Sequence, residues 1–202
     1  MILPPAVRAA ILIAALTAPR APIAPRIVRL QIVNHSRLPQ ANVEGMRSVA
    51  SRIWAQYGVD VEFGWGPGAV IVELAADGDL APSDPSVPVL GTTQFTDGHA
   101  IPMIRLSPPV AEALAAEAEI GVIPFRALSP EHQDAVLERM LGVALAHELA
   151  HYLLDTRQHS SRGLLRERFT TRELAFPEQG RLTLTVEQQR LLYPDAMLNR
   201  RK

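Results

Sequence analysis

The sequence predicts an α+β fold in which a small mixed β-sheet packs on two main helices. Segments with the alternating apolar pattern of strands fall between residues 26 and 106. Two longer segments, 40–57 and 129–154, repeat their apolar residues every three or four positions, as amphipathic helices do. The chain has 202 residues, 48% of them hydrophobic, and can bury one sizeable core. Residues 26–202 are therefore predicted to form a single domain.

The first 25 residues are predicted to be a signal peptide followed by a proline-rich linker. One basic residue, Arg8, precedes the apolar run 9–18, and the proline-rich segment 19–25 follows it. This apolar run has about half the length needed to cross a bilayer, so we expect no stable membrane span. A signal peptide predicts a secreted or periplasmic protein, whereas the alternative is an unstructured cytoplasmic tail.

The segment 26–63 is predicted to form a βαβ unit. Residues 26–33 alternate like a strand with one face on the core, and 59–63 reads as a second strand. Between them, 40–57 forms an amphipathic helix closed by Gly58. The two strands of such a unit lie parallel, and the helix covers one face of the sheet.

Three more strands are predicted, at 69–74, 89–95 and 100–106. The last two are separated by the turn signal Asp97-Gly98 and so form a hairpin, one strand of which we expect at an edge of the sheet. The proline-rich stretch 77–88 is predicted as an exposed loop. An exposed edge beside a metal could pair with an extended peptide, although an ordinary hairpin explains the pattern equally well.

Two helices follow the strands in this interpretation. Pro108 opens an alanine-rich segment, 108–120, with Gly121 as its stop. Ser129 and Pro130 then provide an N-cap and a proline at the first helical position. The second main helix is expected to run from there to about Leu154.

That helix carries the motif His147-Glu148-x-x-His151. Residues four apart in a helix project from one face, so both imidazoles can bind one ion. Glu148 is turned away by about 100° and would lie near a water on the metal. The alternative is a purely structural histidine pair. The chain has no cysteine, so any zinc must be held by nitrogen and oxygen.

A catalytic zinc site needs a third protein ligand and a fourth position left to water. Three candidates follow the helix, namely His159, Glu167 and Glu173. A glutamate completes the site in the gluzincin class of zinc peptidases, and for that reading Glu173 ranks ahead of Glu167. Spacing alone does not decide among them.

The stretch His147-Glu148-x-x-His151, followed by His159-Ser160-x-x-Gly163-Leu164-Leu165, resembles the metzincin zinc endopeptidases. The likeness is to a bacterial group with an extended spacing before the last His-Ser, and segments 45–63 and 169–192 also resemble that group. The resemblance implies a metzincin-like fold with a twisted sheet, the zinc motif on the second main helix and a C-terminal helical segment. It also implies that His147, His151 and His159 bind zinc and that Glu148 is the general base.

The chain departs from the metzincin pattern at three positions. Arg157 stands where the ordinary spacing places the third histidine. Asp155 replaces a turn glycine of the extended group, and aspartate tolerates a left-handed backbone better than most residues. We expect Asp155 to end the helix, with a hydrogen bond to a ligating imidazole as the alternative. Leu165 replaces a packing methionine at modest cost. These changes bear on catalytic efficiency more than on metal binding.

The sequence therefore predicts an enzyme, a zinc metallopeptidase (a hydrolase). It would be an endopeptidase that cleaves a peptide or protein substrate through a zinc-activated water, with Zn2+ as its cofactor. Two alternatives remain: a zinc-binding scaffold or partner-binding protein without activity, and a gluzincin-type peptidase. The formal net charge of -1 shows no basic surplus, so we expect no nucleic acid partner, and we expect a monomer. The other histidines, His35, His99 and His132, are predicted to be ordinary residues.

Overall fold

The structure is a computed structural model that describes residues 26–77, 80, 88–120, 123–177 and 182–193. The predicted signal peptide and linker, 1–25, and most of the proline-rich loop 77–88 lie outside these residues. Among the helices in the described ranges, none is both long and apolar enough to span a membrane.

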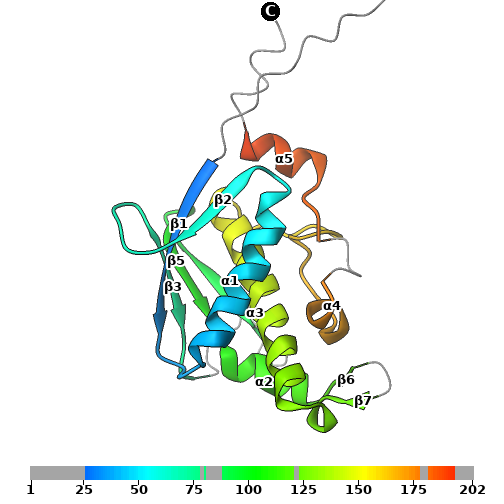
Figure 1. The fold of residues 1–202 in the computed structure, drawn as a ribbon. Helices are drawn as coiled ribbons and strands as arrows, with labels where there is room; N and C mark the ends of the chain where they lie inside the picture. Colours follow the sequence, from blue (N-terminus) through cyan, green and yellow to red (C-terminus); the bar gives the residue numbers. More distant parts are fainter. Residues whose placement is uncertain (1–25, 78–79, 81–87, 121–122, 178–181, 194–202) are drawn as a thin grey trace, which may run out of the picture.

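Five strands form a mixed sheet in the order β2-β1-β3-β5-β4 (Figure 1). The strands are β1 (Arg26–Asn34), β2 (Val59–Phe63), β3 (Val70–Leu74), β4 (Gly91–Thr96) and β5 (His99–Leu106). Strand β1 pairs in parallel with both β2 and β3, and β3 pairs in parallel with β5. The predicted βαβ unit and mixed sheet are therefore confirmed.

The edge strand β4 runs antiparallel to β5, as the hairpin prediction required. Asp97 and Gly98 between them both have positive φ angles, 52° and 86°. Two consecutive left-handed residues make a turn whose twist matches that of the strands, which is why Asp-Gly favours a tight hairpin. The hairpin thus places β4 at one edge of the sheet.

Helix α1 (Gln40–Ala55) covers one face of the sheet and buries the stripe that the sequence predicted. It ends two residues earlier than predicted, and the chain turns at Gly58, whose φ is 69°. Trp54 is fully buried, and its Nε1 donates a hydrogen bond to the carbonyl oxygen of Ala146 at 3.2 Å. This bond ties α1 to the helix that carries the histidines.

Helix α3 (Pro130–Leu153) is the central helix of the molecule, lying beside α1 and in contact with the sheet (Figure 1). It begins at the predicted Ser129-Pro130 signal, although the Ser129 hydroxyl bonds His132 Nδ1 and does not cap the backbone. From Met140 to His151 every residue is buried, because neighbours surround this half of the helix. The motif histidines therefore sit inside the protein on a rigid element.

The alanine-rich helix prediction over 108–120 was too long. Helix α2 (Pro108–Ala116) is followed by a short hairpin of β6 (Glu119–Ile120) and β7 (Ile123–Pro124) and then by the 3₁₀ helix η1 (Phe125–Ala127). Phe125 is buried, and its backbone N–H bonds the carbonyl oxygen of Ala118 at 3.1 Å. Burying this aromatic ring and pairing its backbone outweighs the helix propensity of the preceding residues.

Two short helices, α4 (Thr171–Ala175) and α5 (Val186–Leu192), form the expected C-terminal helical segment. Each begins with a capping box, in which a threonine and a residue three positions later bond each other's backbone. The Tyr57 hydroxyl accepts a bond from the Leu184 N–H at 2.7 Å, and the Tyr193 hydroxyl donates to the Tyr57 carbonyl at 2.6 Å. These bonds hold the segment 184–193 against the turn that follows α1.

Candidate metal centre

Three imidazoles converge at one point of the structure. His147 and His151 project from one face of α3, and His159 comes from the loop that follows it. The Nε2 atom of His151 lies 3.0 Å from that of His147 and 3.3 Å from that of His159. Tetrahedral zinc with Zn–N bonds of about 2.0–2.1 Å holds its nitrogen ligands about 3.3 Å apart. The spacing therefore fits one small cation.

The hydrogen bonds of the two helical histidines decide which ring nitrogens carry protons. His147 Nδ1 lies 2.7 Å from the carbonyl oxygen of Leu164, and His151 Nδ1 lies 2.7 Å from that of Thr156. A carbonyl can only accept, so both Nδ1 atoms must be protonated donors. In the neutral rings both Nε2 atoms are then unprotonated, and their lone pairs face each other across 3.0 Å. A cation between them removes this repulsion, and the carbonyl contacts are the outer support usual for ligating histidines.

The environment keeps these rings neutral, which is the state that binds a metal. Burial lowers the pKa of His147 to about 3, with the nearby His151 adding to the effect. Burial likewise lowers the pKa of His151 to about 4, against the opposing bond to the Thr156 carbonyl.

The turn after α3 brings His159 back to the other two rings. Asp155 has a φ of 47°, so it adopts the left-handed conformation that the metzincin resemblance implies for this position. The next N–H, of Thr156, bonds the carbonyl of His151 at 3.1 Å and so closes the helix end. The Asp155 carboxylate accepts the N–H of Ala100 at 2.7 Å and lies 2.6 Å from His99 Nδ1.

Asp155 thus ends the helix as expected, and the alternative, a bond to a ligating imidazole, was wrong. The partners of Asp155, His99 and Ala100, lie at the start of β5. Their bonds connect the β4–β5 hairpin to the loop after α3 that carries His159. His99 is outside the histidine group, as the sequence predicted, but its contact with Asp155 was not foreseen.

Glu148 is buried, with 6% of its surface exposed, and its carboxyl group contacts Thr93 of the edge strand β4. Burial raises its pKa to about 7, although hydrogen bonds from Thr93 act in the opposite direction. The Thr93 hydroxyl lies 2.9 Å from Glu148 Oε2. Sequence reasoning missed Thr93, since no spacing signal connects residues 55 positions apart.

A cavity of about 690 Å³ opens in front of these groups. Its lining includes the three histidines and Glu148, together with residues of β4 and apolar side chains of α3 and α4 such as Val143 and Leu174. Metal ligands, a carboxyl group and an edge strand thus share one accessible space, large enough for several side chains of a substrate.

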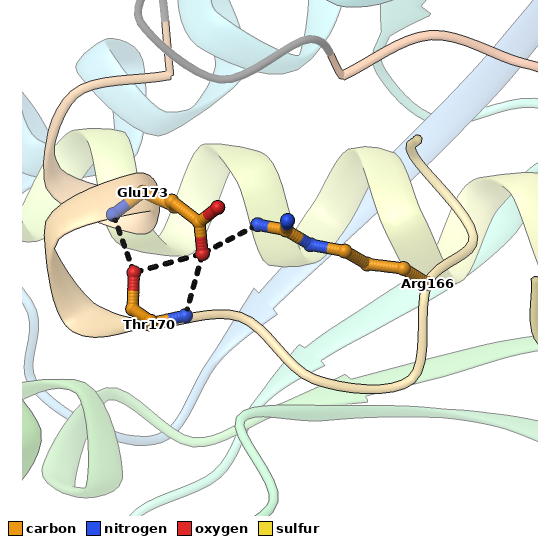
Figure 2. Close-up of polar contacts among 3 residues, drawn as sticks. All are labelled: Arg166, Thr170 and Glu173. Carbon is orange, nitrogen blue, oxygen red and sulfur yellow. Dashed lines mark hydrogen bonds and ion pairs between the residues drawn. The ribbon is translucent and has the colours of Figure 1, made fainter. Parts of the chain in front are cut away.

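The rival third ligands do not join the histidine group. Glu173 caps α4: its Oε2 accepts the Thr170 N–H at 2.9 Å and lies 2.7 Å from an Arg166 nitrogen (Figure 2). Burial raises the pKa of Glu173, but these bonds outweigh it and lower the pKa overall. Glu167 is exposed at the cavity wall and is also outside the group. Helix α4 does contact α3, as the gluzincin alternative predicts. The Glu173 carboxylate on α4, however, already bonds Thr170 and Arg166.

The remaining departures from the metzincin pattern have clear places. Arg157 is exposed, and its guanidinium carbon lies 4.7 Å from the centre of the Phe95 ring, at the rim of the cavity. Leu165 is fully buried, and its carbonyl accepts the Ser160 N–H at 2.8 Å, next to His159. Gly163 has a φ of 82°, and a Cβ there would lie within 2.1 Å of the Thr183 carbonyl oxygen, so only glycine fits.

No family model matches the chain, and no curated protein matches it in sequence. The crystal structure of archaemetzincin from Methanopyrus kandleri superposes on this chain with a TM-score of 0.53, over 84% of this chain and 96% of that one. The chain has an archaemetzincin-like fold. The two sequences are 12% identical, so the likeness concerns the fold.

The archaemetzincin-like fold confirms the coarse architecture predicted from the sequence, a mixed sheet packed with helices. The structure also brings His147, His151 and His159 together as a group that could bind a metal.

Proposed function

We propose that this protein is a zinc-dependent metalloendopeptidase. The observation that carries the proposal is the convergence of three imidazoles, two with bare Nε2 atoms, on the wall of an open cavity beside a buried carboxyl group. Nitrogen donors at about this spacing suit zinc, and the chain has no thiolate to offer another metal. The archaemetzincin-like fold is consistent with the proposal.

His147, His151 and His159 would hold the zinc. When bound, zinc supplies a Lewis acid that activates water and polarises the scissile carbonyl. Glu148 would act as the general base: a carboxylate oxygen takes a proton from the attacking water and passes it to the nitrogen of the leaving amine. A pKa raised toward neutrality by burial suits a group that must both accept and release that proton.

The edge strand β4 would hold the substrate. Within the described part of the sheet, β4 pairs only with β5, and several of its residues line the cavity. An extended peptide could add to this edge by backbone hydrogen bonds, which recognise any sequence, and present its scissile bond to the histidine group. This arrangement supports a peptide or protein substrate.

From the sequence alone, we also propose a secreted or periplasmic location and a monomeric state. The location follows from the predicted signal peptide and linker, 1–25. Residues 26–202 would then form the single peptidase domain.

The role of Glu148 is tested by Glu148→Gln. We expect the variant to retain one zinc per chain, measured by atomic absorption, and to lose hydrolysis of an unfolded protein substrate by about 100-fold or more. Undiminished hydrolysis would remove Glu148 from the role. Zinc binding by the wild-type chain without any hydrolysis would favour the scaffold alternative.

The third ligand is tested by comparing His159→Ala with Glu173→Ala. His159→Ala should lose zinc, whereas Glu173→Ala should keep it, because Glu173 is already used by Thr170 and Arg166. Glu173→Gln is the control, since glutamine at this position of a capping box preserves the cap. Zinc that survives His159→Ala and is lost in both Glu173 variants would support the gluzincin reading.

A further inference from the structure

Thr93 makes a buried contact with Glu148 that crosses from the edge strand to the central helix. The threonine is 8% exposed. Its hydroxyl lies 2.9 Å from Glu148 Oε2 and 2.7 Å from the Glu148 carbonyl oxygen, so one donor serves two acceptors of the same residue. Among the described residues, the hydrogen bonds to the Glu148 side chain all come from Thr93.

The backbone of β4 is shaped to permit this contact. Gly91 lies so close to Glu148 that a Cβ at this position would be 2.8 Å from Glu148 Cγ and 3.2 Å from Oε1. The pairing of β4 with β5 also shifts register between Thr93 and Phe95. Such an irregularity re-aims side chains on an edge strand and is common beside functional sites.

We propose that Thr93 is a positioning residue, which holds Oε2 of Glu148 and so leaves Oε1 to act on the substrate water. This inference rests on the proposed hydrolytic function and adds to it a named atom and a named support. A glutamate side chain has three rotatable bonds, and the Thr93 hydroxyl holds Oε2 while no side chain of the described residues bonds Oε1. Without the Thr93 hydroxyl, the carboxylate would be free to rotate away from its working position.

Thr93 could instead have a purely structural role, connecting β4 to α3 through its bond to the Glu148 carbonyl. A structural residue affects stability and leaves the chemical step of the folded enzyme unchanged. A positioning residue lowers kcat while substrate binding at the edge strand, and hence KM, stays close to that of the wild type. The two roles therefore differ in kinetics.

The experiment compares Thr93→Val, Thr93→Ser and Thr183→Val in the full chain loaded with zinc. Valine has the shape of threonine without the hydroxyl, and serine restores the hydroxyl. Thr183 is an exposed threonine outside both β4 and the cavity lining. We expect Thr93→Val to bind one zinc per chain, to keep KM within twofold and to lower kcat about 10- to 100-fold. Thr93→Ser should recover most of kcat, and Thr183→Val should match the wild type.

A kcat for Thr93→Val within twofold of the wild type would overturn the inference, and so would a serine variant as slow as the valine variant. If Thr93→Val does not fold, as judged by circular dichroism, Thr93→Ala takes its place against the serine variant. Absence of hydrolysis in the wild-type chain would overturn the proposed function together with this inference, whereas hydrolysis indifferent to Thr93 overturns the inference alone.

A second measurement needs no activity. The urea unfolding midpoint of the metal-free protein is compared for Thr93→Val, Glu148→Ala and the double variant. If the two side chains are in contact, the shift of the double variant is smaller than the sum of the single shifts. Shifts that simply add would show that Thr93 does not hold the Glu148 carboxylate, and would overturn the inference whatever the substrate of the enzyme.

Discussion

The close contact between α1 and α3 can be tested at one glycine. Gly142 lies on α3, five residues before His147, and faces Val49 and Met46 of α1. A Cβ at Gly142 would lie within 2.4 Å of Val49 Cβ and 2.8 Å from the carbonyl oxygen of Met46. The substitution Gly142→Ala places a methyl group in this space.

Two opposing effects set the magnitude. Alanine is about 1 kcal/mol more favourable than glycine inside a helix. Overpacking a core costs about 1–3 kcal/mol, and the upper value applies here because one obstacle is backbone and the other is a β-branched side chain with restricted rotamers. The free energy of unfolding should therefore fall by about 2 kcal/mol. For a domain of this size that corresponds to about 4–8 °C in Tm.

Gly45 on α1 offers a matched control in the same helix pair. A Cβ at Gly45 would meet the side chain of Glu138, with Cδ the nearest atom at 2.1 Å. This side chain is flexible and only half-buried, so it can swing away. Gly45→Ala should then keep most of the helix-propensity gain and raise the free energy of unfolding by up to about 1 kcal/mol.

Both variants are measured by urea unfolding of the metal-free protein, followed by circular dichroism. The expected result is opposite signs for the two glycines. A Gly142→Ala protein at least as stable as the wild type would refute the close packing of α1 on α3, and with it the claim that α1 holds the metal-binding helix in place.

Two further predictions concern the site. In the metal-free protein, the pKa values of His147 and His151 are lowered to about 3 and 4. Below pH 6.5 the unfolded chain therefore binds two protons at these histidines that the folded protein does not bind. The pKa of Glu148 is raised to about 7, so between pH 4.5 and 7 the folded protein binds one proton there that the unfolded chain does not. The net difference is one proton, so the free energy of unfolding should fall by about 1.4 kcal/mol per pH unit on acidification from pH 6 to 5. Glu148→Gln removes the opposing proton and should double that slope, measured by urea unfolding at several pH values. An unchanged slope in the variant would contradict the raised pKa of Glu148. Asp155→Ala, which strains the left-handed turn and removes the bonds to the hairpin, should weaken zinc binding severalfold in competition with a chromogenic chelator, and Asp155→Asn should weaken it less. Equal affinities in all three proteins would exclude a role of this turn in placing His159.

The βαβ unit, the two main helices and the histidine pair on α3 were predictable because each depends on local periodicity. Apolar residues three or four apart define the buried stripe of α1, and residues four apart place His147 and His151 on one face of α3. The Asp97-Gly98 turn similarly forms a hairpin through backbone preferences of two adjacent residues. The inclusion of His159 needed the metzincin resemblance, because spacing left three candidates open.

The sequence by itself thus determined the type of fold and the nitrogen ligands offered to a metal. Only the tertiary structure decided what supports them: the Leu164 and Thr156 carbonyls behind the imidazoles, and Thr93 against Glu148. It also ended α2 early and committed Glu173 to a helix cap. The physical reason is that such contacts depend on how a strand and a loop pack against a distant helix. The packing of the whole core sets that arrangement, and local sequence patterns do not contain it.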